Sequence, residues 1–206
     1  MTVPKLLSLN DYNKGSLSSS EWTAAIKLNA NYANLRGVPT TGIKKLNQNN
    51  LCRRCKAPRK ESETIKHVLG SCDFGQALRI KRHHYVKLRL ASILEKKGYV
   101  CFDEAYSRDG DSRSRYIDIV AFDPKSDRAY LIDPTVRYES NSDVAEEVRK
   151  EKAAIYDSCG SYLGAKYESK FGKRRFEVIG LWFGARGTIS RQLVDVFERF
   201  DLDKVF

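Results

Sequence analysis

The stretch "DIVAFDPKSDRAYLID", residues 118–133, predicts the centre of the fold. Two apolar runs flank "DPKSD", and Asp, Pro and Ser are residues that favour turns. An antiparallel β-hairpin is therefore expected. A turn centred between residues 125 and 126 places Phe122 opposite Ala129, and the same register places Asp118 opposite Asp133.

The two opposed carboxylates need a physical explanation. Side chains at directly opposed positions have Cβ atoms about 5 Å apart, and like charges there destabilise a sheet. A divalent cation between Asp118 and Asp133 removes the repulsion, and carboxylate oxygens suit magnesium or manganese. The alternative is a register that differs by a residue or two, so that one acid faces solvent and the other an arginine. Strand alternation also predicts that Tyr116, Val120 and Phe122 share a face with Asp118.

Residues 143–156 predict a helix that brings a lysine to the acids. The segment begins with a capping-box-like pattern, and Lys152 falls inside its apolar arc, whereas Lys150 points away. The apolar arc is formed by Val144, Val148, Ile155 and Tyr156. A lysine within such an arc needs a partner, and the two aspartates or a substrate phosphate would serve. Alternatively, Lys152 extends along the surface to reach solvent.

Other periodic segments complete an α/β fold. Residues 79–97 predict a helix that ends at Gly98, residues 99–105 and 174–183 predict strands, and residues 189–200 predict a C-terminal helix. The buried face of the first of these helices is expected to contain Ile80, His84, Leu88, Ala91 and either Leu94 or Glu95. The predicted fold class is a small mixed β-sheet flanked by helices, preceded by a zinc-binding segment.

The zinc-binding segment is predicted from the spacing of Cys52, Cys55, His67 and Cys72. Thiolate and imidazole ligands at this spacing can close a tetrahedral zinc site. A structural ion is favoured, because four protein ligands leave no open position and a short segment with few large apolar residues needs added stabilisation. The alternative is that these side chains only pack locally. The chain has five cysteines, an odd number that suits thiols or metal ligands better than a disulfide framework.

The positive charge of the chain is concentrated in one region. The formal net charge is +11, and residues 44–97 contain fifteen Lys or Arg against four Asp or Glu. A concentrated basic block favours a polyanionic partner, of which nucleic acid is the common one. The alternative is a solvated, lysine-rich surface. No apolar run reaches the roughly 18 residues of a membrane span, so a soluble, intracellular protein without a membrane partner is expected.

The ordered motifs resemble a known family of nucleases. Asp118 and Asp133 on neighbouring strands, with a lysine nearby, resemble the core of PD-(D/E)xK nucleases. From about Trp22 to its end, the chain resembles the restriction-like endonuclease domain of site-specific non-LTR retrotransposons. The resemblance is carried by "EWTAAIKL", the Cys-Cys-His-Cys cluster, "RHH", the Glu104 region, "RYIDIV", "LIDPT", Lys152-x3-Tyr156 and "LWFGARGTI".

The chain departs from the family pattern at three places. Ile117 stands where the family usually has proline, and His84 stands where its Arg-His triplet usually ends in asparagine. Thr135 stands where most PD-(D/E)xK enzymes carry their lysine. The resemblance implies that the lysine has moved to the following helix, which agrees with the periodicity that points to Lys152.

The resemblance implies a metal-dependent DNA endonuclease that nicks its target to prime reverse transcription. Magnesium or manganese would be held by Asp118, Asp133 and the main-chain carbonyl of Pro134, with Lys152 and Tyr156 completing the catalytic set. Glu104 is a weaker candidate for a further metal or water contact. The expected DNA contacts are Arg53, Arg54, Arg82, His83, His84 and Arg115. Double-stranded DNA, the element RNA and a reverse transcriptase part of a longer protein are the expected partners, in the nucleus.

Three parts and two alternative functions are expected. The parts are a lead-in with an amphipathic helix (1–45), the zinc-binding segment (46–76) and the endonuclease domain (77–206). One alternative function is a zinc-stabilised DNA-binding targeting module that does not cleave. The other is a nuclease like Holliday-junction resolvases, selective for branched DNA.

Overall fold

The computed structural model describes residues 18–30, 32, 35–37, 49–55 and 61–202. The first part of the expected lead-in, and most of the expected loop over residues 37–50, lie outside these residues. The chain divides into two compact units, residues 1–67 and 68–206. No helix in the described part is long and apolar enough to cross a membrane.

The described residues of the first unit include a well-capped helix and a small paired segment. Helix α1 spans Ser19–Asn29, and the Ser18 hydroxyl accepts a hydrogen bond from the Glu21 N–H while the Glu21 carboxylate accepts one from the Ser18 N–H. This reciprocal capping box satisfies backbone groups that the first helical turn leaves unpaired. Leu51 forms an isolated antiparallel bridge with Ser62.

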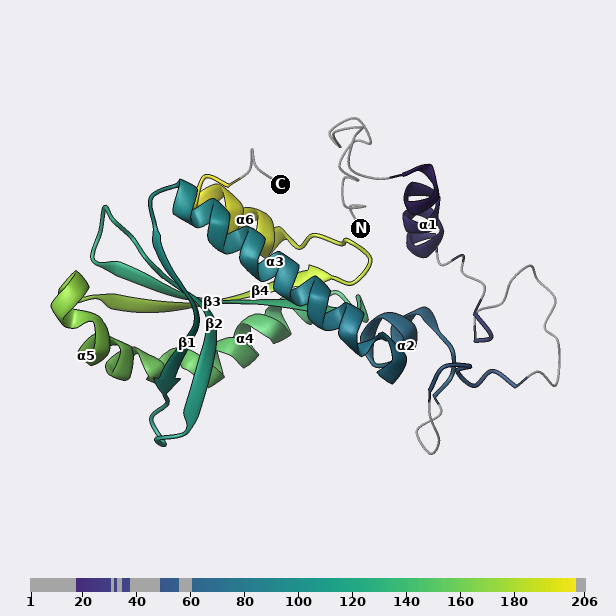
Figure 1. Cartoon of the computed structure of the whole chain (residues 1–206), viewed down its shortest axis with the longest axis horizontal. Helices are drawn as coiled ribbons and strands as arrows, with labels where there is room; N and C mark the ends of the chain where they lie inside the picture. Colours follow the sequence, from purple (N-terminus) through teal and green to yellow (C-terminus); the bar gives the residue numbers. More distant parts are fainter. Residues whose placement is uncertain (1–17, 31, 33–34, 38–48, 56–60, 203–206) are drawn as a thin grey trace. The chain divides into compact units, whose positions relative to one another are not determined.

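The second unit is built on a four-stranded mixed sheet (Figure 1). The strands are β1 (Val100–Arg108), β2 (Ser114–Phe122), β3 (Arg128–Arg137) and β4 (Arg175–Gly184), in that spatial order. The first three pair antiparallel, and β4 joins β3 in parallel. A parallel pair needs a crossover, and the helices between β3 and β4 supply it. The predicted small mixed sheet is confirmed.

Helices cover both faces of this sheet, as Figure 1 shows. One layer consists of α3 (Gln76–Lys96) and α6 (Arg191–Arg199). The other consists of α4 (Val144–Tyr156) and α5 (Gly160–Phe171), the latter not expected from the sequence. The shorter helices are α2 (Ile65–Gly70), η1 (Asp73–Gly75) and η2 (Asp157–Cys159). Each layer buries its own apolar cluster against the sheet, so Asp118 in the middle of β2 and Asp133 in the middle of β3 lie on strands that are packed from both sides.

The buried face of α3 differs from the expected one. Ile80, His84 and Leu88 are exposed, so that part of the sequence prediction is wrong. The face that packs on the sheet contains Lys87, Leu90, Ile93 and Leu94. The error has a physical cause. The inward face contains Lys87, whose charge is neutralised by Asp103 and Glu104 of β1, and a search for apolar periodicity does not detect a buried lysine.

The β2–β3 hairpin has the predicted register, whereas the predicted alternation fails. Phe122 pairs with Ala129, and the ladder ends at Ile119 opposite Ile132, one residue before both aspartates. Ile117 nevertheless packs in the same cluster as Val120 and Phe122, so the side chains of β2 do not alternate strictly through Asp118.

The same interruption occurs in β1. Asp103 pairs with Ile119 and Ala105 with Ile117, and between them Glu104 has φ of 49°. A positive φ is uncommon for a residue other than glycine. Each strand therefore has one residue that departs from the regular pleat, Glu104 in β1 and Asp118 in β2, and these two residues lie opposite each other. The β1–β2 register is the same before and after them.

Candidate active site

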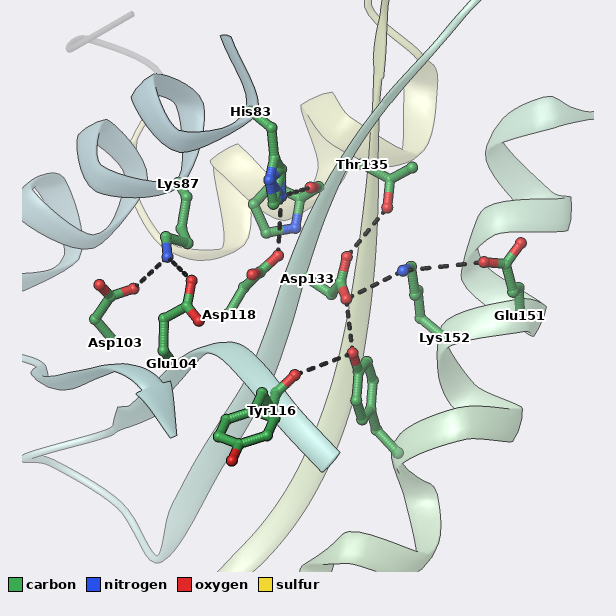
Figure 2. Close-up of polar contacts among 12 residues, drawn as sticks. His83, Lys87, Asp103, Glu104, Tyr116, Asp118, Asp133, Thr135, Glu151 and Lys152 are labelled. Atoms are coloured by element: carbon green, nitrogen blue, oxygen red, sulfur yellow. Dashed lines mark hydrogen bonds and ion pairs between the residues drawn. The ribbon is translucent and has the colours of Figure 1, made fainter. Parts of the chain in front are cut away.

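The acids lie where β2 and β3 cease to pair. Figure 2 shows Asp118 and Asp133 between two helices, with His83 and Lys87 of α3 on one side and Lys152 of α4 on the other. Because the ladder stops at the preceding residues, both carboxylates lie in the space between these helices instead of on a continuous sheet face.

Asp133 is held mainly from α4. Its Oδ2 atom lies 3.1 Å from Lys152 Nζ and accepts a hydrogen bond of 3.0 Å from the Tyr156 hydroxyl. Its Oδ1 atom accepts a bond of 3.1 Å from the Thr135 hydroxyl. Only 14% of the Lys152 side chain is exposed, against 71% for Lys150, so the predicted inward direction of Lys152 is confirmed. Burial, followed by the charge of Asp133, raises the pKa of Tyr156, which keeps its hydroxyl a donor.

Gly180 permits the close approach of α4 that brings Lys152 to Asp133. Gly180 lies beside Asp133 in the parallel β3–β4 register. A Cβ atom at this position would lie 2.9 Å from Lys152 Cβ and Cγ and 3.0 Å from the Val148 carbonyl oxygen. Sequence analysis missed this role, although a glycine inside the predicted strand 174–183 is a known sign of a close backbone approach.

Asp118 is contacted from α3. Its Oδ2 atom lies 3.1 Å from His83 Nε2, which also lies 3.0 Å from the main-chain oxygen of Pro134. A carbonyl oxygen only accepts, so Nε2 carries the hydrogen and donates. Burial and then the nearby charge of Asp133 raise the pKa of Asp118 to about 7. The carboxylates of Asp118 and Asp133 are therefore close together and partly shielded from water, so ionising both of them has a high free energy.

Lys87 links α3 to the irregular residue of β1. Its Nζ lies 2.6 Å from Glu104 Oε1 and 2.8 Å from Asp103 Oδ1, and only 1% of its side chain is exposed. Such a buried cation is stable only when paired. Burial lowers the pKa of Lys87, yet the hydrogen bonds of the two acids outweigh this effect and the net pKa is raised. Lys87 and His83 thus tie successive turns of α3 to β1 and β2.

The four predicted zinc ligands come together. Ligand atoms of Cys52, Cys55, His67 and Cys72 all lie within 4.8 Å of one another, and all four residues are buried. Three thiols and one imidazole are a donor set that fits zinc. Burial raises the pKa of the Cys52 thiol, but backbone N–H donors, led by that of Arg54, lower it to about 7. The cluster could bind a metal ion and is consistent with structural zinc.

A carboxylate supports the histidine of this cluster. Glu61 Oε2 lies 2.8 Å from His67 Nδ1, while His67 Nε2 faces Cys55 Sγ at 3.1 Å. A partner on the second ring nitrogen orients an imidazole ligand and makes it more basic.

Several of the expected DNA contacts have partners within the chain. Arg53 forms an ion pair with Glu63 at 2.7 Å, and Arg115 forms one with Asp109 at 2.7 Å. Arg82 donates to the carbonyl oxygens of Leu69 and Ala185. Arg54 and His84 are exposed, and His83 lies at Asp118. The predicted DNA contacts of all six remain predictions.

Comparison with known proteins points to a retrotransposon. The chain is 29% identical over 171 residues to a retrovirus-related Pol polyprotein from the type-1 retrotransposable element R2 of Popillia japonica. The match covers 83% of the chain and 33% of that relative, so the chain spans about a third of the relative's length. This likeness supports a retrotransposon-related domain. No protein-family model matches the chain.

A solved structure also shows a partial likeness. A crystal structure of a protein of unknown function matches with a TM-score of 0.34 and 12% identity, over 56% of this chain and 53% of that one.

Proposed function

We propose that this chain is the endonuclease domain of an R2-like retrotransposon polyprotein, with a PD-(D/E)xK type of active site. It would nick target DNA in the nucleus, and the exposed 3′ hydroxyl would prime reverse transcription. The single observation that carries the proposal is the convergence of Asp118, Asp133 and Lys152, in a chain that resembles an R2 Pol polyprotein.

The donor set fits a hard divalent cation. Asp118, Asp133 and the carbonyl of Pro134 offer only oxygen atoms, which magnesium and manganese prefer. The raised pKa of Asp118 supports this fit, because a cation offsets the mutual repulsion that burial makes costly. When bound, the ion would polarise the scissile phosphate and lower the pKa of an attacking water.

The remaining side chains would hold the acids and the reacting groups. Lys152 neutralises part of the charge of Asp133 and can donate to a phosphate oxygen as negative charge develops there. Tyr156 orients Asp133 through its hydroxyl, which also lies 3.4 Å from the Tyr116 carbonyl oxygen. Its role is therefore to position a carboxylate.

The zinc cluster and basic residues would supply affinity for double-stranded DNA. Lysine and arginine side chains that contact phosphates release counterions from the DNA, and this release contributes less free energy at higher salt concentration. Binding should therefore decrease steeply with salt concentration. The element RNA and the reverse transcriptase region of the polyprotein would be the other partners.

Supercoiled-plasmid nicking tests the proposal. With magnesium or manganese, the wild type should produce open circles, and Asp118→Ala, Asp133→Ala and Lys152→Ala should each lose most of this activity. Lys150→Ala is the matched control, because Lys150 lies on the same helix and points to solvent.

The outcomes separate the candidate functions. Equal cleavage by all variants would indicate a contaminating nuclease and contradict the mechanism. Salt-sensitive binding without nicking would favour a DNA-binding targeting module. Strong preference for four-way junctions over linear duplex would favour a resolvase-like nuclease.

A further inference from the structure

We propose that His83 is a direct ligand of the cation at the acid site and that its imidazole makes the site favour Mn²⁺ over Mg²⁺. The inference rests on the metal site of the proposed function. It starts from one atom: His83 Nε2 lies between Asp118 Oδ2 and the Pro134 carbonyl oxygen, two of the atoms that would hold the ion.

The spacing of these atoms matches a coordination shell. Neighbouring ligands of an octahedral ion with bonds of about 2.1 Å are separated by about 3.0 Å. The Nε2 atom of His83 lies 3.1 Å from Asp118 Oδ2 and 3.0 Å from the Pro134 oxygen. Both separations that involve Nε2 thus match those between neighbouring ligands of one ion.

The fold holds His83 in this position. Lys87, one helical turn further along α3, is anchored to Asp103 and Glu104, so the turn that carries His83 is fixed relative to β1. The side chain of His83 is 38% exposed, which leaves the ring accessible to an ion from solvent.

Charge and donor type also favour this ligand. The carboxylates of Asp118 and Asp133 already balance a dication, so a neutral third donor adds a bond without further repulsion. On binding, the ring would carry its hydrogen on Nδ1 and direct the Nε2 lone pair to the ion. Imidazole nitrogen binds Mn²⁺ and later transition metals better than Mg²⁺, which prefers oxygen. His83 would therefore determine metal preference.

Manganese binding measured by electron paramagnetic resonance tests the inference on the full chain with its zinc site filled. Pulsed spectra of bound Mn²⁺ should show coupling to an imidazole ¹⁴N nucleus, and His83→Ala should abolish it. The ratio of Mn²⁺ to Mg²⁺ affinity, obtained by competition, should decrease by about tenfold or more in that variant. His84→Ala is the matched control, because this adjacent histidine is exposed and should leave both readouts unchanged.

The results separate this inference from the nuclease proposal. Mn²⁺ bound to the wild type without ¹⁴N coupling, or an unchanged affinity ratio in His83→Ala, would overturn the role of His83. Plasmid nicking that requires Asp118 and Asp133 would still support the nuclease. Conversely, ¹⁴N coupling in a protein that never cleaves DNA would support the ligand and reject the nuclease. A wild type that binds no Mn²⁺ would reject the ligand and the metal site together.

Discussion

Replacement of Asp118 by asparagine should stabilise the protein at neutral pH when no divalent cation is added. The folded chain raises the pKa of Asp118 from 3.8 to about 7. Below about pH 4, the carboxyl is protonated in both the folded and the unfolded state. As pH rises, the unfolded state loses its proton first, so the stability of the wild type falls until pH about 7 and the loss is complete above it.

The size of the effect follows from the shift. One pKa unit corresponds to about 1.4 kcal/mol, so a shift of about three units gives an upper value of about 4 kcal/mol. The Asp118 side chain is 17% exposed, and screening by solvent reduces the expected gain to about 2–4 kcal/mol at pH 8. Asparagine retains an oxygen that can accept from His83 Nε2, so the substitution removes mainly the charge.

Urea unfolding between pH 4 and pH 8 measures this difference. Fluorescence of Trp182, which packs against Val144 and Val148 of α4, reports on the second unit when Trp22→Phe is present in every protein. The zinc cluster titrates equally in both proteins, so its contribution cancels in the difference. Asp111→Asn, in an exposed loop, controls for the loss of a surface charge.

A divalent cation should remove most of this difference. Mn²⁺ at about 100 times its Kd should stabilise the wild type by about 2.7 kcal/mol and leave Asp118→Asn little changed. Parallel stability curves for wild type and Asp118→Asn across the pH range would refute the reasoning. So would a variant less stable than the wild type at pH 8 without added cation.

Three further predictions concern Gly180, the zinc cluster and Lys87. Gly180→Ala should lower the free energy of unfolding, measured in urea, by about 1–3 kcal/mol, because its Cβ would lie 2.9 Å from Lys152 Cβ and Cγ. The variant should also reduce nicking, and full activity would contradict the role of Gly180 in the close approach of α4. Metal analysis of protein purified without chelator should give about one zinc per chain, and Cys52→Ser should lose that zinc and the fold of the segment, whereas full occupancy would contradict the ligand set. Lys87→Met should change the free energy of unfolding by no more than about 2 kcal/mol, because the side chains of Asp103 and Glu104 are 46% and 59% exposed and water can solvate them once the buried cation is removed. The variant should also free Glu104 and weaken Mn²⁺ binding, and unchanged Mn²⁺ affinity would show that the anchor is dispensable.

Local rules predicted the parts of the site that depend on neighbours in sequence. Turn residues and apolar runs gave the hairpin register, because a short connection leaves few ways to pair Phe122 with Ala129. Helical periodicity placed Lys152 inward and Lys150 outward, because the direction of a side chain on a helix depends only on its position along the helix. The zinc ligands were predicted from spacing, since a tetrahedral ion imposes its own geometry on a short segment.

The sequence could not predict what depends on distant contacts. The positive φ of Glu104 accompanies an ion pair with Lys87 seventeen residues earlier, and no local propensity favours it. The inward face of α3 contains a charged side chain, so apolar periodicity selected Ile80 and Leu88 instead. His83 was assigned to DNA because its contact with Asp118, thirty-five residues away, is not visible in either segment.

The matched irregularities in β1 and β2 link two positions that an engineer would otherwise treat as independent. Deleting one residue from β1 or β2 alone would shift the register of the β1–β2 pair by one residue and move Ala105 or Ile117 out of the apolar cluster. A double deletion at Glu104 and Asp118 would keep the β1–β2 register but would remove one of the two acids. The irregular residue of β2 is thus also the residue that brings a carboxylate to the site.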